Sequence, residues 1–337
     1  MPDTAPPLPP DVNAHGWLVA DASTGDVLAA RDPHGRYYPA STLKLLTLLA
    51  LYPRLDPAAV VTATVEDEHM EGSRVGLVDG GVYDIATLWL CLMLQSGNDA
   101  ANALTRTAGG LEATLDAMYQ VADYLGAYDT SPGGPSGLDV QGQRSSPYDL
   151  ALLMTAAADD PALLTIMSTP QAQIPPVAGR DPGFQIQNEN RLLANYPDAV
   201  AAKSGFTDAA RHTLAGVAER GGRRLVFSLM LAEQVPVPTW EQAARLLDWG
   251  FALPPDIPPV GELVAPGALR VPVESEVTPD SSTAVAPPAE VNAAPDFAGT
   301  PALVVPLVAL TTGALATAVG MLLWFRRTGK PRRRVRH

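Results

Sequence analysis

The spacing of apolar residues divides the first 251 residues into expected strands and helices. Two short apolar runs, 16–21 and 27–30, flank a polar turn that contains glycine, which predicts a β-hairpin. The leucine-rich run 41–51 stops before Pro53 and is apolar nearly all round, which is typical of a buried central helix.

The middle of the chain is predicted to be mostly helical. We expect helices over residues 85–94, 111–125 and 146–157. Between them we expect an irregular acidic stretch over 60–83 and a glycine-rich loop over 132–143.

Strand patterns return after residue 198. Residues 200–207 form a short apolar strand, and the apolar runs 213–218 and 224–231 flank a Gly-Gly turn, which predicts a second hairpin. An amphipathic helix is expected over 239–251.

Beyond residue 252 the composition changes twice. Residues 253–300 are rich in proline, and we expect a stalk, although 263–273 could form isolated strands. Residues 301–325 carry no charged side chain and are long enough to cross a bilayer as one helix. The basic tail, 326–337, holds seven Arg or Lys and no acid, so the positive-inside rule places it in the cytoplasm and the rest of the chain outside. A buried helix of a soluble core is the alternative, but it would not explain these cations.

Charge and the N-terminus add two expectations. Outside the basic tail, 16 basic and 36 acidic side chains give the chain a net charge of −20, which argues against nucleic-acid binding. Residues 1–14 are proline-rich and expected to be extended, and they show no signal peptide. Because the predicted topology requires export, either the true N-terminus lies upstream, or this is a processed form, or the topology is wrong, and we favour a missing signal.

The chemistry begins with the lysines. Only Lys44, Lys203 and Lys330 are lysine among 23 basic residues, and Lys330 lies in the basic tail. A partly buried lysine can lose its proton and act as a base, whereas arginine cannot. Lys44 follows Ser41 by three residues, so one helical turn brings the amine within reach of the hydroxyl. Taken alone, this motif also fits an ordinary helix start.

Cysteine and histidine point to no further chemistry. The single cysteine, Cys91, lies in the apolar run 88–94 and is expected to be a small core residue, so no intrachain disulfide is possible. The five histidines show no ligand spacing. We therefore expect neither a metal nor a cofactor.

Two further motifs follow Ser41-x-x-Lys44 in a fixed order. Ser96-Gly97-Asn98 lies in a polar run that fits either a capped helix start or a site loop, and Lys203-Ser204-Gly205 lies on an expected strand. The ordered set resembles S-x-x-K, S-x-N and K-T/S-G of the serine penicillin-binding proteins and β-lactamases. Flanking runs such as PASTLKLLT, SGNDAANAL, PSGLD and KSGFTDAA are most similar to the low-molecular-mass D-alanyl-D-alanine carboxypeptidases, over about residues 15–251.

The resemblance implies a role for each motif residue. Ser41 would be the acylated nucleophile and Lys44 its base. Lys203 would raise the local positive potential and so help to keep Lys44 neutral. Ser96 would relay a proton to the leaving amine, and Asn98 would hold the peptide group of the substrate.

The resemblance also implies a substrate-binding strand. The backbone N–H groups of Ser41 and Phe206, on either side of Gly205, would form the oxyanion hole. The hydroxyls of Ser204 and Thr207 would contact the terminal carboxylate of the substrate.

Three positions depart from the family pattern. Arg211 stands where relatives have glycine, and Thr239 stands at the usual position of an arginine, so Arg211 is a candidate to replace that charge near the substrate carboxylate. Gln143 and Arg144 stand where relatives carry a histidine. The usual β-rich second domain is not visible.

Taken together, we expect an α+β fold over residues 15–252, similar to β-lactamases and DD-peptidases. A mostly antiparallel sheet would be flanked by helices, with a helical subdomain inserted over about 55–195 and one C-terminal transmembrane helix. The implied enzyme is a membrane-anchored serine carboxypeptidase that trims peptidoglycan stem peptides ending in D-Ala-D-Ala, and β-lactams would inhibit it.

Two alternatives stay open. A catalytically impaired penicillin-binding or wall-binding protein would keep the three motifs without turnover. A class A β-lactamase would need a glutamate after the second motif to activate water, and Glu189 is the one candidate, in a sequence context that does not match.

Overall fold

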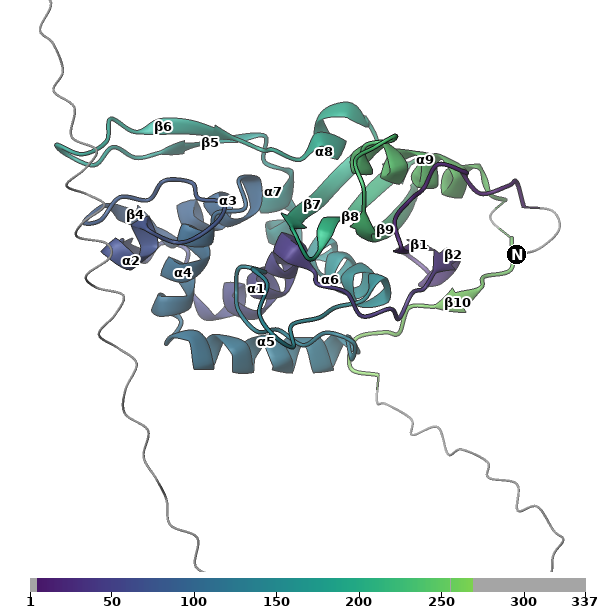
Figure 1. Cartoon of the computed structure of the whole chain (residues 1–337), viewed down its shortest axis with the longest axis horizontal. Coiled ribbons are helices and arrows are strands. Elements are labelled where there is room, and N and C mark those ends of the chain that lie inside the picture. Colours follow the sequence, from purple (N-terminus) through teal and green to yellow (C-terminus); the bar gives the residue numbers. More distant parts are fainter. Residues whose placement is uncertain (1–4, 255, 269–337) are drawn as a thin grey trace, which may run out of the picture. The chain divides into compact units, whose positions relative to one another are not determined.

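Strands from two distant parts of the chain, 16–31 and 199–262, meet in one sheet (Figure 1). The computed structural model describes residues 5–254 and 256–268. Within them, six strands lie in the order β10-β2-β1-β9-β8-β7, and every neighbouring pair is antiparallel. Their bounds are β1 (Gly16–Asp21), β2 (Asp26–Arg31), β7 (Ala199–Thr207), β8 (Arg211–Arg220), β9 (Arg223–Ala232) and β10 (Gly261–Glu262). The predicted antiparallel sheet and both predicted hairpins are confirmed.

Both faces of the sheet are covered, which explains why β1 is apolar throughout. Successive side chains of a strand point to opposite faces. Trp17 and Val19 pack in the core beneath α9 (Thr239–Ala252), whereas Leu18 and Ala20 pack in the core shared with α1 (Lys44–Leu51) and α6 (Pro147–Asp159). The central helix α1 is therefore buried, as its leucines predict, and it packs against α5 (Leu111–Leu125) and α6, while α6 itself packs on the sheet.

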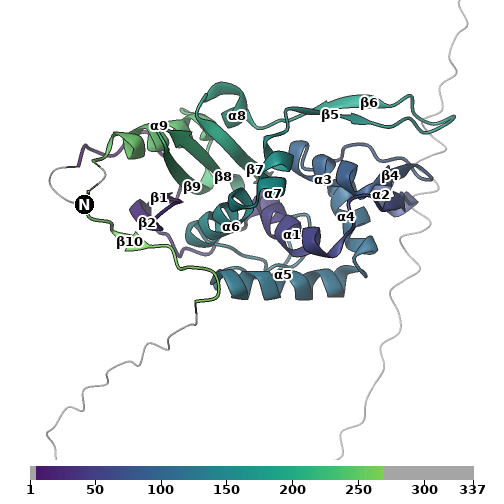
Figure 2. The ribbon, with the colours of Figure 1, turned by 180° about the vertical axis from the view of Figure 1, so that it is seen from behind.

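Helices and two small hairpins are inserted between β2 and β7 (Figures 1 and 2). The helical elements besides α1 and α6 are η1 (Ala40–Leu43), η2 (Tyr52–Arg54), α2 (Val65–Glu68), α3 (Ile85–Leu94), α4 (Asn98–Thr107), α5 (Leu111–Leu125), α7 (Pro161–Ser168) and α8 (Arg191–Asn195). The hairpins are β3 (Val60–Thr62) with β4 (Val82–Asp84), and β5 (Gln171–Ile174) with β6 (Phe184–Gln187). Cys91 is fully buried in α3, as predicted for a core residue.

The stretch 60–83, predicted to be irregular, contains β3, α2 and part of β4, while residues 69–81 form no helix or strand, as predicted. Three-residue strands are too short to show an alternating pattern. Helix α2 has only four residues, and a capping box between Thr64 and Asp67 fixes its start. Elements this short are specified by single contacts, so periodicity misses them.

Part of the predicted stalk belongs to the sheet. Strand β10 pairs with β2 and places Gly261 opposite Val27, and Leu263 is buried in the core. Of the possible strands over 263–273, residues 263–268 form none, because the pairing lies two residues earlier, and residues 269–273 are outside the described part. Residues 269–337 lie outside the described part, and this range includes the predicted span 301–325.

In the described part, no single helix is both long and apolar enough to cross a membrane. Only α6 and α7 pass that test together, and their axes are bent by 103° at the break between them.

Candidate active site

Ser41 lies on a tight turn rather than in a regular α-helix. It belongs to the 3-10 turn η1, and α1 begins only at Lys44. The preceding Ala40 has φ of +47°, a conformation that is costly for a residue with a side chain. The hydroxyl of Thr213 in β8 donates to the carbonyl of Pro39 at 2.8 Å and so anchors this turn to the sheet.

The edge strand β7 runs directly beside the backbone of Ser41. A Cβ atom at Gly205 would lie 2.6 Å from the Ser41 nitrogen, so only glycine fits there. On the other side, a Cβ at Gly137 would overlap the carbonyl of Ala40. This close approach is the geometry that the predicted oxyanion hole requires, with the Ser41 N–H beside the β7 backbone that leads into Phe206.

The amine of Lys44 is fully buried and touches three oxygen atoms. Its Nζ lies 3.1 Å from Ser41 Oγ, 2.7 Å from Asn98 Oδ1 and 2.6 Å from the carbonyl oxygen of Ser136. Burial, and secondarily the positive charge of Lys203, hold the pKa of Lys44 well below its ordinary value, while Asp99 opposes them. The lysine is therefore poised to be neutral.

A neutral Lys44 matches these three contacts. An uncharged amine keeps two N–H donors and one lone pair. The two shorter contacts are to acceptors, Asn98 Oδ1 and the Ser136 carbonyl, which take the two N–H groups. The lone pair is then left to accept the hydroxyl proton of Ser41, as a general base must.

The second motif meets the third across the pocket. Lys203 is 3% exposed, and its Nζ donates to Ser96 Oγ at 3.1 Å and to the carbonyl of Ser204 at 2.8 Å. Burial lowers the pKa of Lys203 to about 7, and the negative charge of Glu189 acts in the opposite direction. Ser96 has φ of +59°, so the second motif holds its serine in a strained conformation, whereas in the first motif the strained residue is Ala40, just before Ser41.

Asn98 is held in place by hydrogen bonds to the loop that contains Glu71 and Ser73. Its Nδ2 donates to the carbonyl of Glu71 at 2.6 Å, and its backbone N–H donates to the carbonyl of Ser73 at 2.7 Å. The buried carboxylate of Asp99 accepts N–H groups from Val75, Gly76 and Leu77. The sequence allowed either a site loop or a helix start over the polar run 95–102. The structure shows that the run is both, because it lines the site and begins α4.

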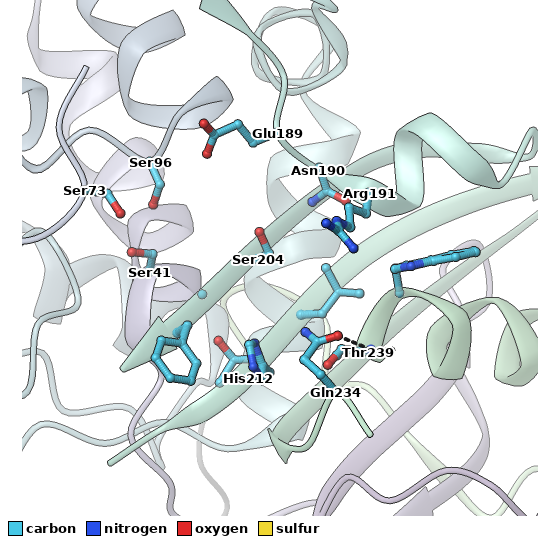
Figure 3. Close-up of a pocket in the computed structure, with 15 residues that line it drawn as sticks. Ser41, Ser73, Ser96, Glu189, Asn190, Arg191, Ser204, His212, Gln234 and Thr239 are labelled. Carbon is cyan, nitrogen blue, oxygen red and sulfur yellow. Dashed lines mark hydrogen bonds between the residues drawn. The ribbon is translucent and has the colours of Figure 1, made fainter. Parts of the chain in front are cut away.

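These groups open into a pocket of about 340 Å³ (Figure 3). One end, which we call the reactive end, is lined by Ser41, Ser73 and Ser96, with Lys44 and Lys203 buried behind it. Ser204, Gly205 and Phe206 of β7 form one wall. The other end, which we call the anion end, is lined by Asn190, Arg191 and Thr239.

Two predicted binding residues do not line this pocket. The Thr207 hydroxyl donates to Asp139 Oδ1 at 2.8 Å. The Arg211 guanidinium donates to both carboxylate oxygens of Glu233, at 2.8 and 3.0 Å. Arg211 therefore stands outside the residues that line the pocket, in an ion pair with the residue that follows β9.

Several pocket groups escaped the sequence analysis. Ser73, Glu189, Asn190 and Arg191 lie on loops or at the start of a five-residue helix, where no periodic signal exists. Ser136 acts through its backbone carbonyl, which any residue could supply, although the run PSGLD that carries it was part of the family resemblance.

Comparison with known proteins agrees with this geometry. The family model for D-alanyl-D-alanine carboxypeptidase matches residues 3–234. The chain belongs to this family. Its fold and its enzyme class, a serine hydrolase, are those of the D-alanyl-D-alanine carboxypeptidases.

Individual relatives extend the match. The chain is 43% identical to the D-alanyl-D-alanine carboxypeptidase DacB2 of Mycobacterium tuberculosis over 73% of this chain and 85% of the relative. It is 32% identical to DacD of Escherichia coli K12 over 72% of this chain and 64% of the relative. A crystal structure of a D-alanyl-D-alanine carboxypeptidase from M. tuberculosis H37Rv superposes with a TM-score of 0.74, at 41% identity, over 78% of this chain and 99% of that one.

A more distant structure shows the fold alone. The Streptomyces K15 DD-transpeptidase superposes with a TM-score of 0.69 at 24% identity, over 74% of this chain and all of that one.

Proposed function

We propose that this carboxypeptidase removes the terminal D-alanine from peptidoglycan stem peptides through an acyl-enzyme on Ser41. The observation that carries this proposal is the contact between Ser41 Oγ and the buried amine of Lys44, whose pKa is held low. A serine becomes a nucleophile when a neighbouring base takes its proton.

The pocket supplies a side chain or a backbone N–H group for each step of this reaction. Ser41 Oγ attacks the carbonyl carbon of the penultimate D-alanine while Lys44 accepts the hydroxyl proton. The N–H groups of Ser41 and Phe206 stabilise the developing oxyanion. Ser96 passes a proton to the leaving nitrogen as the C–N bond breaks, it is reprotonated by the proton that Lys44 accepted, and free D-alanine departs. Water then attacks the ester carbonyl, Lys44 accepts the proton of the water and returns it to Ser41 Oγ as the ester C–O bond breaks, and the shortened peptide leaves with a free carboxylate.

The test is release of D-alanine from an N-acylated tripeptide ending in D-Ala-D-Ala. We expect the native full-length protein to release one D-alanine per peptide, and the Ser41→Ala variant to release none. A native protein that forms a stable adduct with benzylpenicillin but releases no D-alanine would instead be an impaired penicillin-binding protein.

One observation bears on the β-lactamase alternative. Glu189 lines the pocket, where its charge acts on Lys203. If Glu189 activated water against the penicilloyl ester, the benzylpenicillin adduct would turn over quickly in the native protein and persist in Glu189→Gln. We expect the adduct to persist in the native protein and in Glu189→Gln, because the chain has the family and the fold of carboxypeptidases.

We further propose that residues 301–325 anchor the enzyme in the cell membrane as a single span. The catalytic domain would then lie outside the cytoplasm, next to its peptidoglycan substrate, and the basic tail inside. The support is the uncharged stretch followed by seven cations. Full-length protein should require detergent for extraction from membranes, whereas a chain ending at residue 300 should not. Extraction of the full-length protein by salt alone would contradict this topology.

A further inference from the structure

Arg191 differs from every other arginine in the described part of the chain. The guanidinium groups of the other arginines donate to carboxylates, carbonyls or an amide of the protein. The Arg191 guanidinium makes no hydrogen bond or ion pair with any described residue, yet it lines the pocket. Among the residues that line the pocket it is the one permanent cation.

Two buried polar groups beside Arg191 also lack partners within residues 5–254 and 256–268. Asn190 Nδ2 and Thr239 Oγ1 are buried and form no hydrogen bond with a described residue, and their residues, 5% and 4% exposed, both line the pocket. The Asn190 Oδ1 atom caps α8 by accepting a hydrogen bond from the Leu192 N–H, and the amide nitrogen of the same side chain remains without a partner. Most buried polar groups in folded proteins are satisfied, so two such groups in one pocket indicate a place for a ligand.

All three groups can donate hydrogen bonds, so the site favours an anion. Figure 3 shows Asn190, Arg191 and Thr239 at the end of the pocket away from Ser73 and Ser96, with Ser204 between the two ends. A guanidinium matches a carboxylate with two parallel N–H groups. Glu189 is the acidic residue nearest to Arg191 in sequence, and its charge raises the pKa of Lys203 in the same pocket.

We propose that Arg191, with Asn190 Nδ2 and the Thr239 hydroxyl, binds the C-terminal carboxylate of the substrate. This inference rests on the proposed function, because that carboxylate belongs to the D-alanine that leaves. It assigns to α8 a charge that Arg211 cannot supply while it is paired with Glu233. Lys203 is a weaker candidate for the same task, because burial lowers its pKa to about 7 and leaves it partly neutral near that pH.

The test compares two substrates in the full-length protein: an N-acylated tripeptide ending in D-Ala-D-Ala, and the same peptide as its C-terminal amide. The native enzyme should prefer the acid. In Arg191→Gln, kcat/KM for the acid should fall by about 10- to 100-fold, the range expected for loss of a charge-assisted contact, while the amide should change little. Arg191→Lys should recover part of the preference for the acid.

The matched control is Arg245→Gln, an exposed arginine of α9 that pairs with Asp11 and Glu241 away from the pocket. It should leave both rates unchanged. A purely structural role for Arg191 would lower both rates equally and would overturn the proposal. An acid preference that survives in Arg191→Gln but disappears in Arg211→Gln would overturn it as well.

A second substrate pair separates this inference from the proposed function. If the native protein releases no D-alanine, the proposed function fails. The inference is then decided by the rates of adduct formation with benzylpenicillin and with its methyl ester. Loss of the acid preference in Arg191→Gln would support the carboxylate site, and an unchanged preference would refute it.

Discussion

The polar groups at the two ends of the pocket differ in whether they have hydrogen-bond partners within the protein. At the reactive end, the amines of Lys44 and Lys203 are buried and contact oxygen atoms of the protein. At the anion end, Arg191 and two neighbouring donors have no partner among the described residues. The first end is preorganised for chemistry and the second is left open for substrate.

This difference follows from what each end has to do. A base must be held at a fixed distance from its nucleophile with a shifted pKa, and burial with defined hydrogen bonds achieves both. A substrate-binding group must instead exchange solvent for ligand, so a partner within the protein would compete with the substrate. Arg211 has such a competing partner in Glu233, whereas the Arg191 guanidinium has none among the described residues.

Removing the base should have the largest effect. In Lys44→Arg the charge cannot be lost, so Ser41 has no acceptor for its proton and the rate of acylation by benzylpenicillin should fall by about 10²- to 10⁴-fold. Lys44→Met, uncharged and of similar length, should lose as much and decides the matter if the arginine disturbs folding. Thermal unfolding of each variant is the control. A folded Lys44→Met protein that acylates at the native rate would show that Lys44 is not the base.

Moving the β7 backbone should have an intermediate effect. A methyl group at Gly205 would lie 2.6 Å from the Ser41 nitrogen and push the strand away from the nucleophile. We expect Gly205→Ala to lower the acylation rate by about 10²-fold, as a displacement of about 1 Å can. Gly261→Ala, also on a strand but with its added Cβ at an ordinary 3.8 Å from Val27, is the matched control. Equal rates in the two variants would mean that β7 does not position the reaction.

The smallest effect is electrostatic. A nearby carboxylate favours the charged form of a lysine, so Glu189 raises the pKa of Lys203 against the lowering by burial. In Glu189→Gln the titration midpoint of Lys203 should therefore move below about 7. Because the chain has only three lysines, NMR of protein labelled at lysine can follow Lys203 directly. Glu68→Gln, whose carboxylate pairs with Arg180, is the control. An upward shift or none in Glu189→Gln would contradict the assigned charge interaction.

The same contrast explains what the sequence could predict. Ser41 and Lys44 are three residues apart on one turn, so local geometry brings them together. The order of the three motifs identified the family, which placed Lys203 in the same site as Lys44, but its contact with Ser96 came only from the structure. Long elements such as α5 and the β8–β9 hairpin were also predictable, because their periodicity extends over many residues.

The anion end was not predictable, because it depends on register and on short elements. Arg191 starts a helix of five residues that follows the β5–β6 hairpin, and no spacing in the sequence relates it to Thr239. Arg211 was chosen instead because of its position in the family pattern. Its pairing with Glu233 follows from the β8–β9 register, in which His212 lies opposite Ala232.

The central claim is that Ser41 is the acylated nucleophile of this pocket. The most direct test is the intact mass of the full-length protein after incubation with benzylpenicillin, beside the Ser41→Ala variant. We expect one covalent adduct on the native protein and none on the variant. A folded native protein without an adduct, or an adduct that persists in Ser41→Ala, would contradict it.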